Sequence, residues 1–207
     1  MKVPPTPDDT ELLRLVSAGD EEAFVTLYRR RQGGIYRFAL QMSGSEAVAE
    51  DVTQEVFMAL VREAKNYDPA KGSLSGYLYG IARNHVLRSL ERDRSHVQFV
   101  DDAEENGAPV SERLIAQDDP LGDFARSEML ERLRLAILAL PAHYREVVVL
   151  CELHEMNYTE AAAVLGCAVG TVRSRLHRAR ALLIEKLRAP GDADSESHVF
   201  NSARCFA

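Results

Sequence analysis

The sequence has 207 residues, 46% of them hydrophobic and 28% charged, which is enough apolar material for one or two packed domains. No run approaches the ~18 consecutive apolar residues of a membrane span, and the amino-terminal residues lack the apolar core of a secretory signal. Three cysteines without Cys-x-x-Cys spacing argue against a disulfide framework or a zinc site. We therefore expect a cytoplasmic protein that is not inserted in a membrane and binds no metal or cofactor.

The net charge of −7 is unevenly distributed along the chain. Residues 98–128 hold nine acidic side chains and two arginines, whereas residues 171–188 hold six basic side chains and one glutamate. Affinity for phosphate depends on the local density of basic groups more than on the total charge. The overall acidity therefore does not exclude a nucleic-acid partner.

Helical spacing of apolar residues predicts four helices before residue 95. The first stops at Gly19, and Asp20 is a suitable N-cap for the second. The second helix contains the pair Gly33-Gly34, which disfavours an unbroken helix. The third helix is expected over residues 45–65 and the fourth over residues 75–94, with a loop between them.

Residues 95–122 have no periodicity and are acidic, which indicates an extended linker. Helical spacing returns near Phe124, breaks at Pro141 and continues to a tight helix pair that ends near Leu187. No segment shows the alternation of a strand. The prediction is an all-α fold with two small helical domains at 8–95 and 123–188, an acidic flexible linker at 96–122, and a disordered tail at 189–207.

Residues 158–180 have the pattern of a helix-turn-helix. Gly166 suits the left-handed turn, Ala162 permits a close helix crossing, and an apolar stripe that includes Val172 and Leu176 lies opposite a basic face. A solvated amphipathic helix is the alternative, but the three features together favour DNA binding. The residues expected to contact DNA are Arg173, Ser174, Arg175, His177, Arg178 and Arg180.

The predicted third helix has more apolar residues than one core stripe requires. Phe57, Met58 and Val61 fall opposite that stripe, among acidic side chains. Either a neighbouring helix of the same domain covers them, or they form an exposed ridge for a partner protein. We expect Phe57 and Met58 to be exposed on such a ridge.

The fourth helix and the loop before it interleave basic residues with tyrosines. Cations can follow the backbone of a single strand while aromatic faces stack on its bases, a combination that suits melted DNA. Some of these tyrosines and their apolar neighbours could instead belong to the core, and the sequence leaves both readings open.

These motifs together resemble a known family. Residues 140–147 and 158–180 resemble the promoter-reading C-terminal domain of the extracytoplasmic-function sigma factors, a subfamily of the sigma-70 family. Residues 49–57 resemble their polymerase-binding helix, and residues 77–84 resemble the helix that reads the melted minus-ten element. The resemblance covers residues 10–94 and 124–187 in the family's order.

The resemblance implies a sigma factor without catalytic activity, whose partners are core RNA polymerase, promoter DNA and an anti-sigma factor. The C-terminal domain would read the duplex minus-thirty-five element, and the N-terminal domain would bind the melted non-template strand. For the minus-ten element the expected residues are Tyr67, Lys71, Tyr77, Arg83, Asn84 and Arg88. For polymerase they are Asp51, Gln54, Glu55, Phe57 and Met58.

Three positions depart from the family pattern. Tyr77 replaces a common tryptophan, Arg88 replaces an aspartate, and Ala168 replaces the serine or proline that usually precedes the recognition helix. Because alanine offers no side-chain cap, we expect a softer start of that helix.

Two other classes of protein are alternatives to a sigma factor. A response-regulator-like activator has a similar helix-turn-helix, but its receiver domain needs strands that residues 1–95 do not predict. An enzyme would need a phosphate-binding glycine loop, a nucleophile triad or a metal-ligand spacing, and none is evident.

Overall fold

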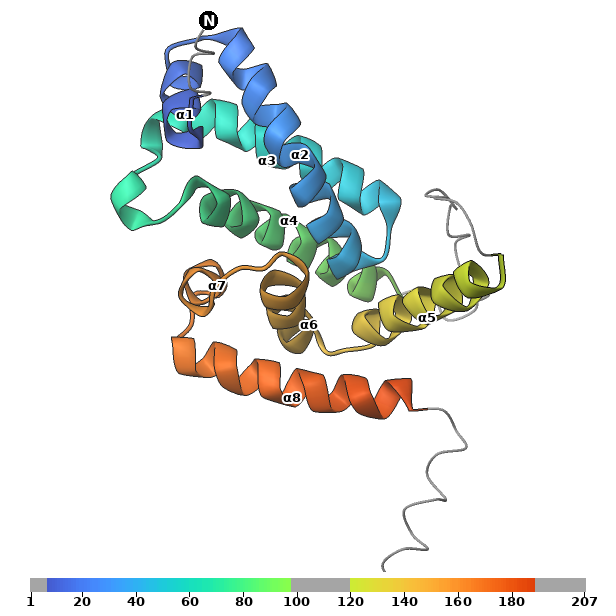
Figure 1. Cartoon of the computed structure of the whole chain (residues 1–207). Helices are drawn as coiled ribbons and strands as arrows, with labels where there is room; N and C mark the ends of the chain where they lie inside the picture. The colour runs from blue at the N-terminus through green and yellow to red at the C-terminus, as the bar shows by residue number, and fades with distance from the viewer. Residues whose placement is uncertain (1–6, 98–119, 189–207) are drawn as a thin grey trace, which may run out of the picture.

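The computed structural model describes residues 7–97 and 120–188, and every regular element in these ranges is helical (Figure 1). The prediction of an all-α fold is therefore confirmed for these residues. The α-helices are α1 (Asp9–Ser17), α2 (Glu21–Ser43), α3 (Glu46–Glu63), α4 (Leu74–Val97), α5 (Pro120–Leu138), α6 (Ala142–Val148), α7 (Tyr158–Leu165) and α8 (Val169–Leu187). Short turns complete the chain at η1 (Ala64–Asn66), η2 (Pro69–Lys71) and the π-helical η3 (Val149–Leu153).

Side chains ahead of the first three helices set where those helices begin. Asp8, Asp20 and Ser45 each accept a hydrogen bond from a backbone N–H in the first turn of α1, α2 and α3, respectively. Such caps satisfy donors that the helix itself leaves without a partner. The predicted N-cap at Asp20 is thus confirmed.

Helix α2 runs unbroken through Gly33 and Gly34, contrary to the break that this pair suggested. A Cβ atom at Gly34 would lie 3.0 Å from the hydroxyl oxygen of Tyr79 on α4. The glycine therefore lets α4 approach α2 closely, and the surrounding packing outweighs the low helix propensity of two glycines.

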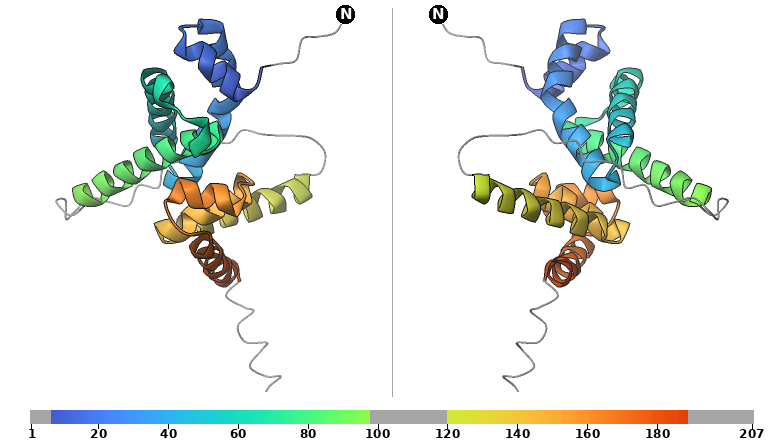
Figure 2. Two further views of the ribbon diagram at one scale, coloured as in Figure 1. Left: turned by 90° about the vertical axis from the view of Figure 1, so that its left-hand side faces the viewer. Right: turned by 90° about the vertical axis from the view of Figure 1, so that its right-hand side faces the viewer.

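The amino-terminal helices α1–α4 form one packed group, in which α3 contacts both α2 and α4. The carboxy-terminal group is built on α8, which contacts α5, α6 and α7. Figures 1 and 2 show α8 along the edge of the molecule that lies farthest from α1 and α2.

The two groups also pack against each other, because α4 contacts α7 and α2 contacts α5, α6 and η3. One cluster of buried apolar residues extends through both groups, from Leu12 in α1 to Ala179 in α8. At Gly44 (φ 75°), which caps α2, an added Cβ would lie 3.0 Å from a methyl carbon of Leu138 in α5. The guanidinium of Arg145 joins the groups through hydrogen bonds to the carbonyl oxygens of Met42 and Leu140.

Candidate nucleic-acid and polymerase interfaces

The helix-turn-helix consists of α7, a tight turn and α8. Asn157 and Glu160 form a capping box at the start of α7, and Gly166 ends that helix in the left-handed conformation (φ 63°). Ala168 precedes α8 with extended dihedral angles and makes no side-chain cap. The turn glycine and the missing cap agree with the expectations from the sequence, whereas the capping box was overlooked.

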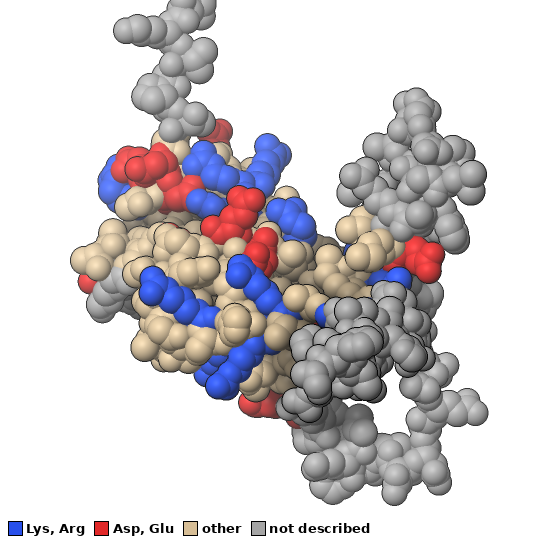
Figure 3. All heavy atoms as spheres, turned by 60° about the horizontal axis from the view of Figure 1, so that its bottom comes forward, with Lys and Arg blue, Asp and Glu red and all other residues tan. Residues whose placement is uncertain are grey.

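Helix α8 separates an apolar side from a basic side. Val172, Leu176 and Ala179 are buried against the rest of the carboxy-terminal group. Five of the six residues expected to meet DNA are exposed, and Arg175 is half-buried at the edge of the apolar side. Figure 3, which looks at this end of the molecule, shows several basic side chains spread over the surface.

Two arginines of α8 are held by residues of other elements. The guanidinium carbon of Arg173 lies 5.8 Å from the centre of the Tyr158 ring, and an Nη of Arg180 lies 2.5 Å from a carboxylate oxygen of Glu152. The pKa of Arg180 is raised, first by its hydrogen bond to Glu152. The sequence pattern predicts neither contact, because Tyr158 and Glu152 lie on elements other than α8 and meet it only in the folded chain.

Two tyrosines come together where the loop after α3 meets α4. The rings of Tyr67 and Tyr77 have centres 5.6 Å apart, so these candidates for stacking on DNA lie side by side. The Tyr67 hydroxyl donates to the carbonyl oxygen of Gly72, and the Tyr77 hydroxyl donates to a carboxylate oxygen of Glu63. Partial burial raises the pKa of both hydroxyls, and the nearby Glu63 adds to the rise at Tyr77.

Helix α4 places three minus-ten candidates along one ridge. Tyr77, Asn84 and Arg88 follow one another at spacings of seven and four residues, which align them on one side of a helix. Asn84 and Arg88 are exposed and Tyr77 is half-buried. The side chain of Lys71 lies outside the described part of the structure.

Arg83 does not share this ridge. Its Nε lies 2.8 Å from a carboxylate oxygen of Glu146 in α6, although the two atoms are not aligned as in a directed hydrogen bond. The Glu146 side chain is only 3% exposed, and that of Arg83 is 22% exposed. The structure therefore places Arg83 in the contact between the two helical groups.

A second polar contact joins the groups through His154, just after η3. Its Nε2 lies 2.9 Å from the carbonyl oxygen of the Gln41 side chain, which can only accept, so this nitrogen donates. The Tyr79 hydroxyl lies 2.8 Å from the other ring nitrogen and donates to it when the imidazole is neutral. Burial lowers the pKa of His154 to about 4, and the positive charge of Arg37 adds to the decrease.

On α3 the prediction that Phe57 is exposed is wrong, whereas the prediction that Met58 is exposed is confirmed. Phe57 is 3% exposed and packs edge-on against the rings of Phe24 and Tyr28 from α2. Met58 is 46% exposed and Val61 is 53% exposed. Helices α2 and α4 both pack against α3, and a helical wheel of α3 alone does not contain this information. Phe57, which the wheel places opposite the core stripe, is therefore buried by α2.

A groove of about 900 Å³ runs between α2 and α3 above Phe57. Its floor and walls are mainly aromatic and apolar, and Gln54, Arg37 and Glu50 supply polar atoms. Asp51 and Gln54 are exposed, and Glu55 is half-buried and in ionic contact with Arg62. Of the polymerase candidates, Gln54, Phe57 and Met58 thus line this groove, whereas Asp51 and Glu55 line a separate hollow between α3 and α4.

Models of two protein families match the chain. Residues 27–96 match sigma-70 region 2, and residues 130–183 match sigma-70 region 4. The ECF RNA polymerase sigma factor SigE of Mycolicibacterium smegmatis is 32% identical over 200 residues, which are 94% of this chain and 74% of SigE. The chain belongs to the ECF sigma factors.

Other members of the family show the same likeness. The sigma factor CnrH of Cupriavidus metallidurans is 34% identical over 194 residues, which are 92% of this chain and 98% of CnrH. A solved structure of CnrH with the cytosolic domain of CnrY covers 90% of this chain and 99% of CnrH, with a TM-score of 0.63 and 28% identity. The structure of RpoE with the anti-sigma factor NepR from Bartonella quintana covers 81% of this chain and 98% of RpoE (TM-score 0.65, 25% identity).

As a sigma factor, the protein binds core RNA polymerase and directs it to promoters for transcription initiation. Region 2 corresponds to the amino-terminal group with its groove and tyrosine pair, and region 4 corresponds to the carboxy-terminal group with the helix-turn-helix. The comparisons do not favour the alternative of a response-regulator-like activator.

The described residues also bear on metal sites, membrane spans and the cysteines. Within residues 7–97 and 120–188 no cluster of side chains fits a metal ion, and no described helix is long and apolar enough to cross a membrane. Cys151 and Cys167 are free and half-buried. The acidic linker and the tail, including Cys205, lie largely outside the described residues.

Proposed function

We propose that the two regions of this sigma factor use three separate surfaces. The first is the outward side of α8, which would read the duplex minus-thirty-five element through Arg173, Ser174, Arg175, His177, Arg178 and Arg180. The observation that carries this assignment is the division of α8, whose apolar side is buried and whose basic side is exposed. Guanidinium forks on an exposed helix can meet base edges in the major groove.

The second surface combines the Tyr67–Tyr77 pair with the α4 ridge of Asn84 and Arg88. Two neighbouring aromatic rings, one of them on a helix that also carries an exposed arginine, suit unpaired bases and their backbone, so we assign this surface to the melted non-template strand of the minus-ten element. Lys71 is proposed to assist from the adjoining loop. Arg83 can join this surface only after its contact with Glu146 breaks, since that contact holds it against α6.

The third surface is the groove between α2 and α3, which we assign to core RNA polymerase. An exposed methionine and valine beside an aromatic groove match the apolar anchor of a protein interface. Gln54 would supply a polar contact in the groove and the buried Phe57 would help to shape it, while Asp51 and Glu55 would extend the contact toward α4.

Promoter footprinting with holoenzyme tests the assignment of α8. We expect Arg173→Ala and Arg178→Ala each to weaken upstream duplex binding by ~1–3 kcal/mol, because a bidentate contact with a base is worth about that much. Assembly with core polymerase should remain as in the wild type. Arg14→Ala, a change of the same charge at an exposed residue of α1, is the control. Unchanged upstream protection with both α8 variants would remove these residues from promoter recognition.

We infer further that a regulatory protein binds this sigma factor, since CnrH and RpoE form complexes with CnrY and NepR, respectively. We also propose that it acts in the cytoplasm and catalyses no reaction of its own. Co-purification of the tagged chain from its host, followed by identification of bound proteins other than polymerase subunits, tests the regulatory partner.

A further inference from the structure

The basic residues of α8 fall into two classes by their surroundings. Arg173 and Arg180 are seven residues apart, so they lie on one flank of the helix. Both are in contact with side chains from outside α8, namely Tyr158 at the start of α7 and Glu152 in η3. Arg178 lies on the outward side instead and makes no ion pair with any residue of the described ranges.

Tyr158 is placed to orient Arg173. The guanidinium carbon lies within the ~6 Å at which a cation is attracted by the face of an aromatic ring. The Asn157–Glu160 capping box anchors the backbone where Tyr158 begins α7, and the ring itself is 37% exposed beside α8. An arginine held in this way loses less conformational freedom when it meets a base edge.

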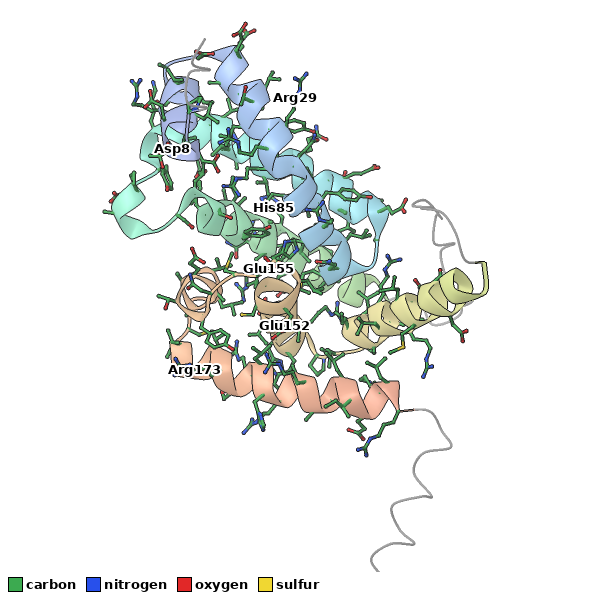
Figure 4. All side chains as sticks on the ribbon, viewed as in Figure 1. Asp8, Arg29, His85, Glu152, Glu155 and Arg173 are labelled. Atoms are coloured by element: carbon green, nitrogen blue, oxygen red, sulfur yellow. The ribbon has the colours of Figure 1, made fainter. Side chains whose placement is uncertain are left out.

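Glu152 has a different relation to Arg180. Its carboxylate lies 2.5 Å from the guanidinium, and both side chains remain about half exposed. DNA phosphate would have to compete with this carboxylate for the same donors. The nearest comparable acid in the motif, Glu160, is already engaged in the capping box of α7. Figure 4 labels Glu152 on the segment that lies above α8 and Arg173 near the amino-terminal end of α8.

We propose that Tyr158 and Glu152 set the sequence selectivity of α8: Tyr158 holds Arg173 ready for a base, and Glu152 withholds Arg180 from phosphate. Phosphate contacts increase affinity for every DNA sequence, whereas base contacts increase affinity only for DNA that carries the matching sequence. A carboxylate that pairs with a phosphate-binding arginine therefore lowers the affinity for non-specific DNA. The base contact then makes the larger contribution to the difference in affinity between sequences. This inference rests on the proposed role of α8 as the reader of the minus-thirty-five element.

Holoenzyme competition between two promoter fragments, one intact and one with a scrambled minus-thirty-five element, tests the role of Glu152. We expect Glu152→Gln to bind the scrambled fragment several-fold more tightly and to reduce discrimination between the fragments. The slope of log affinity against log salt should become steeper by about 0.9, the value of one added phosphate contact. Glu131→Gln is the matched control, because the partly exposed Glu131 is also paired with an arginine, Arg134, but on α5. Equal behaviour of the two variants would overturn the role of Glu152.

The same assay tests Tyr158 with a pair of variants. Tyr158→Leu should weaken binding of the intact fragment by about two- to tenfold and leave the scrambled fragment unchanged, because ordering one long side chain costs that much affinity. Tyr158→Phe keeps the ring beside Arg173 and loses only the hydroxyl, whose interaction with Arg180 is secondary to that of Glu152, so it should discriminate between the fragments nearly as the wild type does. Equal losses on both fragments, or no loss, would refute the orienting role. Thermal melting of both variants identifies a folding defect, and Tyr158→Phe then still tests whether the ring suffices.

Arg178→Ala, measured alongside, separates this inference from the proposed function. If Arg178→Ala abolishes discrimination while the Glu152 and Tyr158 variants match their controls, only the selectivity inference fails. If Arg178→Ala and Arg173→Ala both leave discrimination unchanged, α8 is not the reader and both proposals fail.

Discussion

Phe57 and Met58 are adjacent on α3 but serve opposite purposes. Phe57 is 3% exposed and belongs to an aromatic cluster with Phe24 and Tyr28, whereas Met58 is 46% exposed beside the groove. Aromatic pairs in edge-on contact stabilise by ~0.5–1.5 kcal/mol beyond the burial of their area. Phe57 therefore maintains the shape of the groove, and Met58 is available to a partner.

Alanine substitutions of Phe57 and Met58 should consequently differ in their effects on folding stability and on assembly with core polymerase. Phe57→Ala should lower the free energy of unfolding by ~3–5 kcal/mol because it leaves a cavity. Met58→Ala should change it by no more than ~0.5 kcal/mol, as is usual for a surface residue, but should weaken competition for core polymerase. Urea unfolding and a core-polymerase competition titration measure the two effects. Wild-type competition by Met58→Ala would argue against the groove as the polymerase site.

The two helices of the helix-turn-helix begin differently. A reciprocal capping box starts α7, while α8 follows Ala168, whose side chain cannot accept a hydrogen bond from the first turn. Ala168 is exposed, and its dihedral angles (φ −69°, ψ 147°) are those of an ordinary N-cap residue. The backbone is thus ready for a cap that the sequence does not supply, and α8 begins less firmly than α7.

Ala168→Ser should supply this cap. We expect it to raise the free energy of unfolding by ~1 kcal/mol, since the serine oxygen can accept from a free N–H in the first turn of α8. Asn157→Ala, which removes the existing cap of α7, should lower stability by a similar amount. Thermal unfolding of both variants checks the pair. If Asn157→Ala lowers stability but Ala168→Ser does not raise it, the N–H groups in the first turn of α8 already have other hydrogen-bond partners.

At the scale of the whole molecule, regions 2 and 4 share one buried core and several polar contacts. His154 is the contact that responds to pH, because it is held neutral between Tyr79 and Gln41 with Arg37 nearby. Its pKa is about 4 in the folded protein, against 6.5 as the ordinary value. Between these values the unfolded chain binds more protons than the folded one, so stability falls as the pH falls.

This linkage predicts a pH-dependent difference between the wild type and His154→Gln. At pH 7 the wild type should be the more stable protein. As the pH is lowered from 6.5 to 4, the wild type loses the contribution of neutral His154 and the difference should shrink. Urea unfolding at intervals across this range measures it, with the exposed His177→Gln as control. A difference that stays constant from pH 7 to pH 4 would mean that His154 does not titrate as its burial requires.

The sequence by itself determined the local features of this sigma factor. The helices, the cap at Asp20, the left-handed turn at Gly166 and the apolar side of α8 all follow from neighbours within a few residues. Periodicity and capping act over one or two helical turns, so they can be read without knowledge of the fold. The family resemblance was visible for the same reason, because its motifs are short and lie on single helices.

Only the tertiary structure decided which residues meet across the chain. Phe57 is buried because α2 covers a side of α3 that a helical wheel leaves open, and Arg83 is paired with Glu146 because α4 and α6 meet there. The place of Gly34 inside α2, where it leaves room for the Tyr79 hydroxyl of α4, is likewise a contact between separate helices. These outcomes depend on packing between segments far apart in sequence, and hydrophobic periodicity within one helix carries no information about its neighbours.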